Sequence, residues 1–454
     1  MSVKKLNIII LLIMLCAALT SASSFKLGGY YRSWAQYDYP PSRIPFDRLT
    51  HIFHAFAWPE SDGRLAYDAA FLNPELLQKA HQVNVKVLLA LGGAVNSGGF
   101  AAMAANDNAR ARFIENVAQF LQTHHYDGVD IDWEFPQSAT DRLNLVKLVN
   151  ELRQKLDTLS GDLLITMAVP VNDWYGRWFQ FEVLKNMVDW FNAMTYDFHG
   201  SWTAHSGHNA PLYSPSPQVD ACGSVDDGIR YLLNERGLPP EKILLGLAFY
   251  GREFNSHGLY QSATGGDVTY GYADIVALIG QGWNYRWDDV SKVPYLINSA
   301  SAKLITYDDT LSIALKCRYA LDNHLAGCMT WALGHDQLGD RQPLLQKASE
   351  ILQIWTDLEE SPENLLPAQL ELHVQPNPLQ AHVTFRLILR TKQRISLRLW
   401  DLNGRLVATI IHNKEFSEGE YSLRWQAAGL AAGAYIVELQ NNFQTINQKL
   451  VLLK

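Results

Sequence analysis

The residues best suited to chemistry lie in the segment 127–134, which reads DGVDIDWE. If this segment is a strand, Asp130, Asp132 and Glu134 share one face, because alternate residues of a strand point the same way. Acidic side chains on a buried strand face cost free energy unless they serve a purpose. Crowded carboxyl groups cannot all ionise, so one of them keeps its proton near neutral pH. We predict that Glu134, the last of the three, is a general acid. The alternative is an acidic loop that binds a cation or is only solvated, which the apolar residues between the acids disfavour.

A parallel barrel is the fold that would position these acids. Eight short apolar runs occupy residues 27–31, 51–57, 85–91, 128–134, 163–169, 190–196, 243–249 and 327–332. Such runs are typical of strands buried on both faces. Segments with helical spacing, such as 111–123, 143–156 and 312–323, lie between or after them. This alternation predicts an α/β fold, a (β/α)8 TIM barrel, with Glu134 at the carboxyl end of a strand, where the active sites of such barrels lie.

Two further regions depart from the barrel pattern. The stretch 251–307 is too long for a simple loop and contains a helix candidate at 272–280 and strand candidates near 283–288 and 303–307. It predicts a small α+β insertion subdomain at about 252–307. The acidic, proline-containing stretch DLEESPENLLP predicts a linker at 357–368. Beyond it, apolar and polar residues alternate between turn signals, which predicts a C-terminal β-sandwich at 369–454.

The start of the chain has the pattern of a signal peptide. Lys4 and Lys5 precede an apolar run at 6–19 that is short for a membrane span. We therefore expect residues 1–23 to be removed, leaving a soluble, exported protein with a catalytic barrel at 24–356 and no membrane span.

The tail also differs from the barrel in charge. From residue 365 onward the chain has 10 Lys and Arg against six Asp and Glu, whereas the whole chain has 38 against 46, which indicates a separate unit. No basic run is dense enough to predict nucleic-acid binding.

Cysteine and histidine usage predicts neither a metal site nor a cofactor. Loss of Cys16 with the signal peptide leaves Cys222, Cys317 and Cys328, so at least one thiol stays free or pairs outside the chain. Cys317 and Cys328 are close in sequence, but the spacing assigns no bridge. The chain has no CxxC or HExxH motif, and its 14 His residues show no ligand spacing.

The acidic segment resembles the signature of glycoside hydrolase family 18, the chitinases. Asp127, Asp130, Asp132 and Glu134 match the family pattern DxxDxDxE at every position. Further matches, in chain order, are Gly29-Tyr30-Tyr31, Phe56 in the second strand, Met194-Thr195-Tyr196-Asp197, Tyr250-Gly251-Arg252, and Trp331 in the eighth strand. The insertion is similar to a shortened chitinase insertion domain.

The resemblance implies retaining, substrate-assisted hydrolysis of chitin or of N-acetylglucosamine oligomers. In this scheme the substrate's acetamido oxygen attacks the anomeric carbon, Glu134 protonates the leaving oxygen, Asp132 orients the acetamido N–H, and Tyr196 binds its carbonyl. The implied catalytic residues are Glu134, Asp132, Asp130 and Tyr196. The implied substrate-binding residues are Tyr30, Phe56, Trp133, Met194, Asp197, Tyr250, Arg252 and Trp331. We expect a monomer that needs no cofactor and no metal.

The third strand departs from the family pattern. It usually ends in SxGG, but here it reads Ala90-Leu91-Gly92-Gly93. The missing hydroxyl leaves Asp130 with one donor fewer, so we expect only Tyr30 or water to contact it. In addition, several tryptophans in or near predicted loops either line a sugar groove or serve packing: Trp34, Trp58, Trp174, Trp178, Trp202, Trp283 and Trp287.

The tail resembles the C-terminal sorting domain of type IX secretion. The matching features are Pro376-Asn377-Pro378, Asp401-Leu402-Asn403-Gly404, Gly419-Glu420-Tyr421 and the segment 430–435. The resemblance implies the type IX secretion machinery as a partner and delivery to the cell surface or beyond. A carbohydrate-binding or fibronectin-like module is the alternative.

Two other functions share the barrel signature. One is an endo-β-N-acetylglucosaminidase that acts on N-glycans, and the other is a non-catalytic chitin-binding lectin. The insertion favours a chitinase, because it would build a groove wall for a linear polymer, and the presence of Glu134 disfavours a lectin. The sequence leaves exo and endo action open.

Overall fold

The computed structural model describes residues 25–159, 162–352, 370–376, 382–389, 392–401, 406–427, 430–440 and 445–452. These residues fall into two compact units, one before and one after residue 357. The predicted signal peptide at 1–23 and linker at 357–368 lie outside the described residues and stay predictions.

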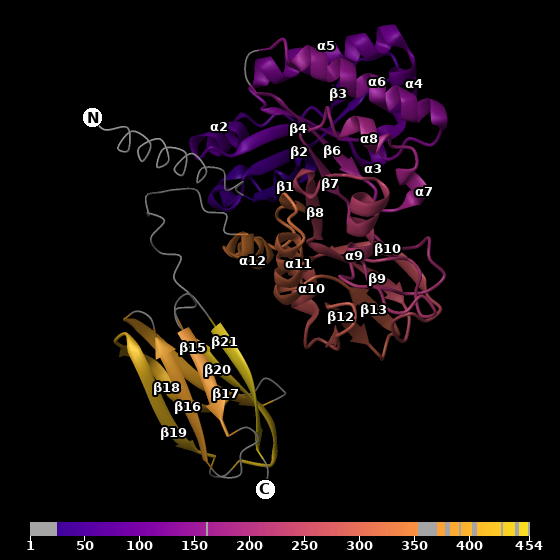
Figure 1. Cartoon of the computed structure of the whole chain (residues 1–454). Coiled ribbons are helices and arrows are strands. Elements are labelled where there is room, and N and C mark those ends of the chain that lie inside the picture. Colours follow the sequence, from indigo (N-terminus) through magenta and orange to yellow (C-terminus); the bar gives the residue numbers. More distant parts are fainter. Residues whose placement is uncertain are drawn as a thin grey trace, which may run out of the picture. The chain divides into compact units, whose positions relative to one another are not determined.

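The first unit is a closed barrel of parallel strands (Figure 1). Its strands are β1 (Lys26–Arg32), β2 (His51–Pro59), β4 (Lys86–Gly92), β5 (Gly128–Asp132), β6 (Leu164–Val169), β7 (Trp190–Ala193), β8 (Ile243–Ala248) and β14 (Gly327–Trp331). They follow the order β1-β14-β8-β7-β6-β5-β4-β2, and pairing of β1 with β2 closes the ring. The short β3 (Leu65–Tyr67) adds to β2 in antiparallel fashion. Each of the eight predicted apolar runs is a barrel strand, so the predicted (β/α)8 fold is confirmed.

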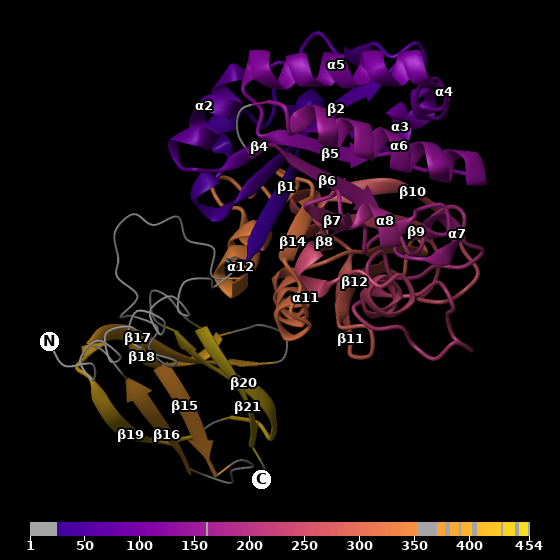
Figure 2. The same cartoon turned by 45° about the horizontal axis from the view of Figure 1, so that its top comes forward.

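Helices follow most of the barrel strands, and the longer ones cover the outside of the barrel. The longer ones are α2 (Pro74–Gln82), α5 (Asp107–His124), α6 (Ala139–Leu156), α11 (Thr310–Asp322) and α12 (Pro343–Leu352); the shorter ones are α3 (Gly93–Asn96), α4 (Phe100–Ala105), α7 (Asp173–Gly176), α8 (Phe181–Leu184) and α9 (Val225–Arg230). Figure 2 shows α5 and α6 side by side. Both begin at polar caps, since Asn106 accepts a hydrogen bond from the backbone of Ala109 and Ser138 from that of Asp141.

The packing of β5 explains why its acids face inward. Val129 and Ile131 are almost fully buried, as are Leu145 and Leu148 of α6, and all four belong to the large core between strands and helices. The alternate residues of β5 must then point into the barrel.

The insertion after β8 is a small antiparallel sheet with one helix. Its strands are β9 (Tyr250–Asn255), β10 (Thr264–Gly271), β11 (Asn284–Asp288), β12 (Val293–Asn298) and β13 (Lys303–Thr306), in the order β10-β9-β13-β12-β11, with α10 (Tyr272–Leu278). The helix and two of these strands were predicted. The prediction missed β9, β10 and β12. Of these, β10 contains three glycines and β12 contains Pro294, and both residue types are unfavourable in strands.

The second unit consists of two antiparallel sheets. One has the order β15 (Leu370–Gln375), β16 (His382–Leu389), β19 (Gly419–Gln426), and the other β18 (Leu406–Phe416), β17 (Gln393–Asp401), β20 (Gly433–Gln440), β21 (Thr445–Leu452). Alternate residues of β16, Val383, Phe385 and Leu387, are buried in one core with Leu397 and Leu399 of β17. This confirms the predicted β-sandwich.

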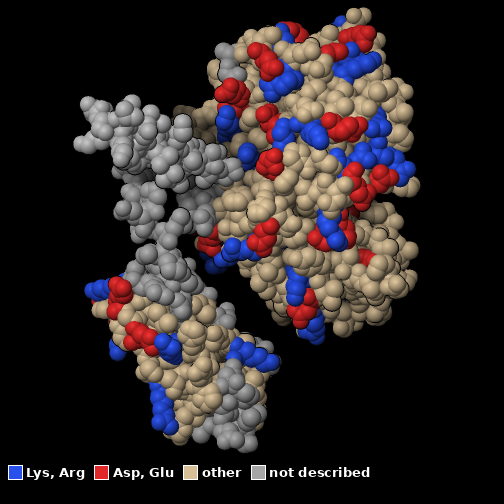
Figure 3. Space-filling model, viewed as in Figure 1, with Lys and Arg blue, Asp and Glu red and all other residues tan. Residues whose placement is uncertain are grey.

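The surface of the described barrel carries charges of both signs. On the face in Figure 3, Lys and Arg side chains alternate with Asp and Glu side chains instead of gathering by sign. Among the described residues, no helix has both the length and the apolar character needed to cross a membrane.

Candidate active site

The last strand residues of β5 bring the acids to the barrel mouth. The strand ends at Asp132 and not, as predicted, at Glu134. The reason is Ser97, whose hydroxyl accepts the backbone N–H of Glu134 at 2.9 Å and lies 3.2 Å from the carbonyl oxygen of Asp132. This contact occupies the backbone groups that a neighbouring strand would otherwise pair with, and it fixes Glu134 just above Asp132.

Asp130 lies at the bottom of the site, fully buried, and has more partners than expected. It accepts hydrogen bonds from the Tyr30 hydroxyl at 2.6 Å, the Thr166 hydroxyl at 2.5 Å and the Asn192 amide at 2.9 Å. The expectation that only Tyr30 or water would contact Asp130 is therefore wrong. Thr166 on β6 and Asn192 on β7 supply donors, although Ala90, its cross-strand neighbour, has none.

Burial raises the pKa values of all three acids, and nearby negative charge adds to the shift at Asp132 and Glu134. Burial raises the pKa of Asp130 to about 6 although three donors oppose the shift. Burial, then Glu134 and Asp130, hold the pKa of Asp132 well above its usual range. Burial and the charge of Asp197 raise the pKa of Glu134 to about 7. Glu134 is thus protonated at mildly acidic pH and stands nearest the opening, as a proton donor must.

Asp132 has a buried oxygen with no hydrogen-bond partner among the described residues. Its side chain is almost fully buried, and Oδ1 has no hydrogen-bond partner among the described residues. An unsatisfied buried carboxylate oxygen is costly, so this atom is a ready acceptor for a donor that enters the site. Tyr196 lines the same cavity as Asp132, and burial, followed by the charge of Asp132, raises the pKa of the Tyr196 hydroxyl.

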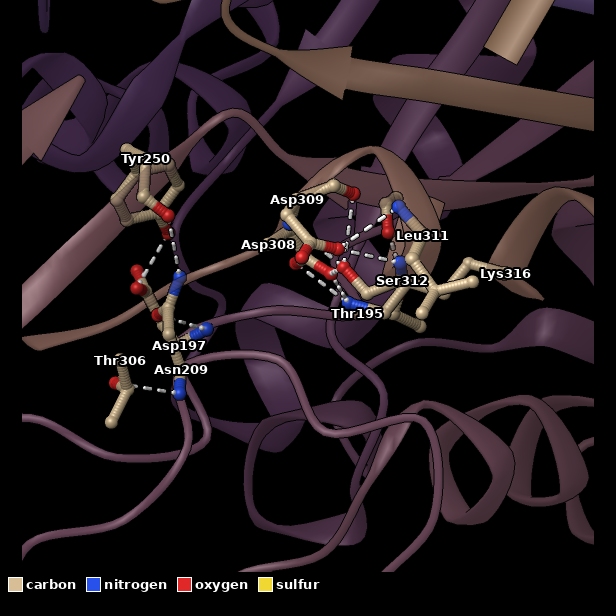
Figure 4. Close-up of polar contacts among 11 residues, drawn as sticks. Thr195, Asp197, Asn209, Tyr250, Thr306, Asp308, Asp309, Leu311, Ser312 and Lys316 are labelled. Atoms are coloured by element: carbon tan, nitrogen blue, oxygen red, sulfur yellow. Dashed lines mark hydrogen bonds and ion pairs between the residues drawn. The ribbon is translucent and has the colours of Figure 1, made fainter. Parts of the chain in front are cut away.

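A second polar group forms the opposite side of the site around Asp197. Its Oδ1 accepts hydrogen bonds from the Tyr250 hydroxyl at 2.5 Å and from Nε of Arg252 at 2.7 Å. Asn209 accepts the backbone N–H of Asp197 and donates to the backbone carbonyl of Tyr250, as Figure 4 shows. The backbone N–H of Asn209 in turn donates to Thr306 of the insertion. Asp197 is therefore held in position by the loop that follows β7 and by the insertion.

Aromatic rings form the floor and walls of a cavity of about 1080 Å³ above the acids. The rings of Trp331 and Phe56 stack with centroids 5.9 Å apart, and Phe56 stacks on Trp34 at 6.1 Å. Gly93 has a φ of 77°, and a Cβ there would lie 2.5 Å from the Phe56 ring. The glycine thus makes room for this floor.

Most of the expected site residues line this cavity. They are Glu134, Asp132, Phe56, Met194, Tyr196, Asp197, Tyr250, Arg252 and Trp331. Asp130 and Tyr30 are buried and do not line the cavity, and the Tyr30 ring lies 5.4 Å from that of Trp331. Trp133 was expected to bind substrate but is buried on the outer side of the barrel, where it stacks on Phe100 at 5.2 Å. Trp133 alternates with the acids along the chain, so its side chain points away from them.

Three of the seven tryptophans considered line the cavity. Trp34, Trp174 and Trp202 are exposed at the cavity wall, whereas Trp58, Trp178, Trp283 and Trp287 do not line it. No local motif marks Thr166, Asn192 or Ser97, because their contacts with the acids arise from segments that are distant in sequence.

Comparisons with known proteins agree with this geometry. Residues 26–336 match the model of glycosyl hydrolases family 18, and residues 373–453 match that of the secretion system C-terminal sorting domain. Chitinase A1 of Niallia circulans is 30% identical, over 73% of this chain and 58% of its own length, so the chain spans less than two thirds of that relative.

Solved structures show the same barrel. An Ostrinia furnacalis Group IV chitinase in complex with allosamidin has a TM-score of 0.66 and 27% identity, covering 72% of this chain and 99% of its own. A chitinase-like agglutinin from Robinia pseudoacacia has a TM-score of 0.64 and 30% identity, covering 72% and 99%. The acidic strand, the aromatic cavity and the family match over residues 26–336 together show that this chain belongs to the glycosyl hydrolases of family 18.

Proposed function

We propose that this protein is a chitinase that hydrolyses β-1,4 bonds between N-acetylglucosamine units with retention of configuration. The observation that carries the proposal is the pair of acids at the end of β5. Glu134 has a pKa raised to about 7, and Asp132 offers a buried oxygen with no hydrogen-bond partner among the described residues.

Glu134 is the general acid. It donates its proton to the glycosidic oxygen as the bond from that oxygen to the anomeric carbon breaks. A pKa of about 7 suits this role, because a catalytic acid works best with a pKa near the operating pH. In the second step the Glu134 carboxylate takes a proton from the water that attacks the anomeric carbon, and the acid is restored.

The nucleophile in this proposal is the acetamido oxygen of the substrate itself. Asp132 and Glu134 come from one strand end and point the same way, so they do not easily flank a sugar ring from opposite faces. The unpartnered Oδ1 of Asp132 accepts the acetamido N–H, and the Tyr196 hydroxyl donates to the acetamido carbonyl. This holds the carbonyl oxygen behind the anomeric carbon, where a five-membered oxazolinium ring forms and later opens. Positioning of this kind lowers the activation free energy by several kcal/mol.

The cavity walls suit a chain of sugars. Flat rings of Trp331, Trp34, Trp174 and Trp202 are spread along a cavity of about 1080 Å³, larger than a single-sugar site requires. The insertion sheet supplies Arg252 to one wall, which supports a groove for a linear polymer over one for a branched N-glycan.

The C-terminal unit points to export, since it matches a secretion-system sorting domain. We infer that it directs the protein through type IX secretion, to the cell surface or beyond. The residues that line the cavity all belong to the first unit, so in this proposal the tail serves delivery and not catalysis.

Product analysis tests the proposed function. Purified protein and its Glu134→Gln variant are incubated with chitin oligomers and, separately, with a high-mannose glycoprotein. We expect the unmodified protein to release short N-acetylglucosamine oligomers and leave the glycoprotein intact, and the variant to release them at least about 100-fold more slowly. Release of glycans would instead support the endo-β-N-acetylglucosaminidase, and binding without any product would support a lectin.

A further inference from the structure

A cluster of potential metal ligands lies beside the substrate cavity, outside the residues assigned to catalysis. His199 and His205 follow β7, and Asp220 and Cys222 precede α9. One nitrogen, sulfur or oxygen atom from each of the four side chains lies within 4.8 Å of the corresponding atom of every other. His199 and Asp220 are buried, and His205 and Cys222 are partly exposed.

Two details of this cluster point to a ligand. The first is Asp220, whose side chain is buried while its Oδ2 has no hydrogen-bond partner among the described residues. Its other oxygen, Oδ1, contacts Nε2 of His199 at 3.1 Å and the backbone N–H of Cys222 at 3.0 Å. A buried carboxylate with one satisfied and one unsatisfied oxygen calls for a further partner.

The second detail is the orientation of His199. Its Nδ1 lies 2.9 Å from the carbonyl oxygen of His208, to which it donates, so Nε2 is directed at the cluster. Metal-binding histidines are commonly oriented in this way, with the second ring nitrogen donating to a backbone carbonyl. Gly207 allows the arrangement, because a Cβ at this position would lie 2.2 Å from the His199 ring.

We propose that His199, His205, Asp220 and Cys222 form a binding site for a zinc ion. Two imidazole nitrogens, a thiolate and a carboxylate are four donors of the types that zinc prefers, and four is the number that a structural zinc site contains. Calcium and magnesium are unsuited to the site, because they require oxygen ligands. The thiolate and carboxylate together balance the charge of the ion.

The geometry requires only a small adjustment. Zinc–ligand distances of about 2.0–2.3 Å place tetrahedral donors roughly 3.4–3.7 Å apart. Nε2 of His199 and Oδ1 of Asp220 are already 3.1 Å apart, whereas the four ligand atoms are up to 4.8 Å apart. The side chains of His205 and Cys222, which are partly exposed, must therefore move closer by about 1 Å through rotation. Gly223, with a φ of 94°, turns the backbone directly after Cys222.

The ion would hold the two ends of the loop 199–222 together, and this loop forms one cavity wall. The four ligands come from the two ends of the segment 199–222, and this segment also carries Trp202. Trp202 and Cys222 both line the cavity, and the guanidinium of Arg252 lies 5.0 Å from the Trp202 ring. Zinc binding would therefore hold Trp202 and Arg252 in place beside the acids.

The rival interpretation is an ion pair between His199 and Asp220 with a free Cys222. Burial opposes a charge on His199, but hydrogen bonds with Asp220 and Cys222 outweigh it and raise the pKa of His199 to about 9. A proton and a zinc ion would thus compete for the same nitrogen, and zinc binding would release protons. The two interpretations differ in whether the protein retains zinc.

The decisive experiment measures zinc binding to the full chain. Protein treated with a chelator under reducing conditions is titrated with zinc, and with magnesium as a control, by calorimetry. We expect one zinc per chain, no binding of magnesium, and affinity at least 10–100-fold lower in Cys222→Ser and His205→Ala, as losses at metal sites usually cost. His257→Ala removes an exposed histidine outside the cluster and should leave zinc affinity unchanged. Absence of zinc binding, or equal affinity in all variants, would overturn the proposal.

A second measurement needs no variant and remains informative if a variant fails to fold. Cys317 and Cys328 are buried, so Cys222 is the thiol of the described residues that a reagent reaches first. We expect zinc to slow the reaction of this thiol with a disulfide reagent, and cobalt in place of zinc to give a thiolate charge-transfer band. An unchanged thiol reactivity, with no such band, would refute Cys222 as a ligand.

Discussion

The pKa of Glu134 depends on the negative charge of Asp197, which one substitution removes and another leaves without its neutralising partner. Asp197 is the principal charged neighbour that raises the pKa of Glu134, after burial, and Arg252 pairs with Asp197 at 2.7 Å. Asp197→Asn removes the negative charge but keeps an oxygen for Tyr250. Arg252→Met removes the neutralising cation and leaves Asp197 charged. The two variants should therefore shift the pKa of Glu134 in opposite directions.

The size of these shifts follows from the electrostatics of the cavity. At an effective dielectric constant of about 20, one like charge in the same cavity raises a pKa by on the order of one unit, and the cation of Arg252 cancels part of this effect. The acid must be protonated to act, so kcat/KM falls as pH rises through its pKa of about 7. We expect this alkaline limb to move down by about half to one pH unit in Asp197→Asn and up by a similar amount in Arg252→Met.

The assay is the pH dependence of kcat/KM on a fluorogenic chitin oligomer for the unmodified protein and both variants. Both substitutions also lower the rate, because Asp197 and Arg252 line the cavity, so the position of the limb and not its height is the test. An unmoved limb in both variants, or movement in the same direction, would refute the assignment of this limb to Glu134.

Three other predictions concern the acid, the cavity wall and the tail. Glu134→Gln should lower the hydrolysis rate by on the order of 10²–10⁴-fold, measured on chitin oligomers. Between pH 4.5 and about 7, Glu134 ionises in the unfolded chain but stays protonated in the folded one, so the folded state loses stability as pH rises. The same variant lacks this group. It should therefore raise the free energy of unfolding at pH 8 by on the order of 2–3 kcal/mol and leave it unchanged at pH 4. Trp174→Ala, at an exposed cavity residue, should raise KM for long oligomers about fivefold, through lost apolar contact of roughly 1 kcal/mol, with little change for a disaccharide substrate. Deletion of 366–454 should leave chitin cleavage by purified protein intact but block export in the native host, which cell fractionation measures; normal export would contradict the sorting role.

The fold was predictable because its signals are local. Each barrel strand is an apolar run, and the acids of β5 alternate with Val129 and Ile131 in a pattern that only a strand explains. The end of β5 was not predictable, because Ser97 lies outside the strand in sequence and sets it through a side-chain contact. The placement of Trp133 was an avoidable error. It was carried over from the family motif, whereas the strand period of two places it with Val129 and Ile131 on the helix side.

The surroundings of the acids were less accessible to sequence reasoning. Thr166 and Asn192 reach Asp130 only because β5, β6 and β7 are neighbours in register, and nothing in either residue's local sequence marks it as a donor. The cluster of His199, His205, Asp220 and Cys222 has the same origin, since a long loop brings its two ends together. Contacts between segments distant in sequence depend on topology, which a single sequence does not display.

Turnover of a fully deacetylated oligomer, beside the acetylated oligomer of the same length, tests the central claim most directly. If the acetamido oxygen is the nucleophile and Asp132 its guide, the acetylated chain is cleaved and the glucosamine chain is not, although both contain the same β-1,4 bonds. Efficient cleavage of the glucosamine chain would contradict substrate assistance, because the nucleophile would then have to come from the protein, with Asp132 as its source.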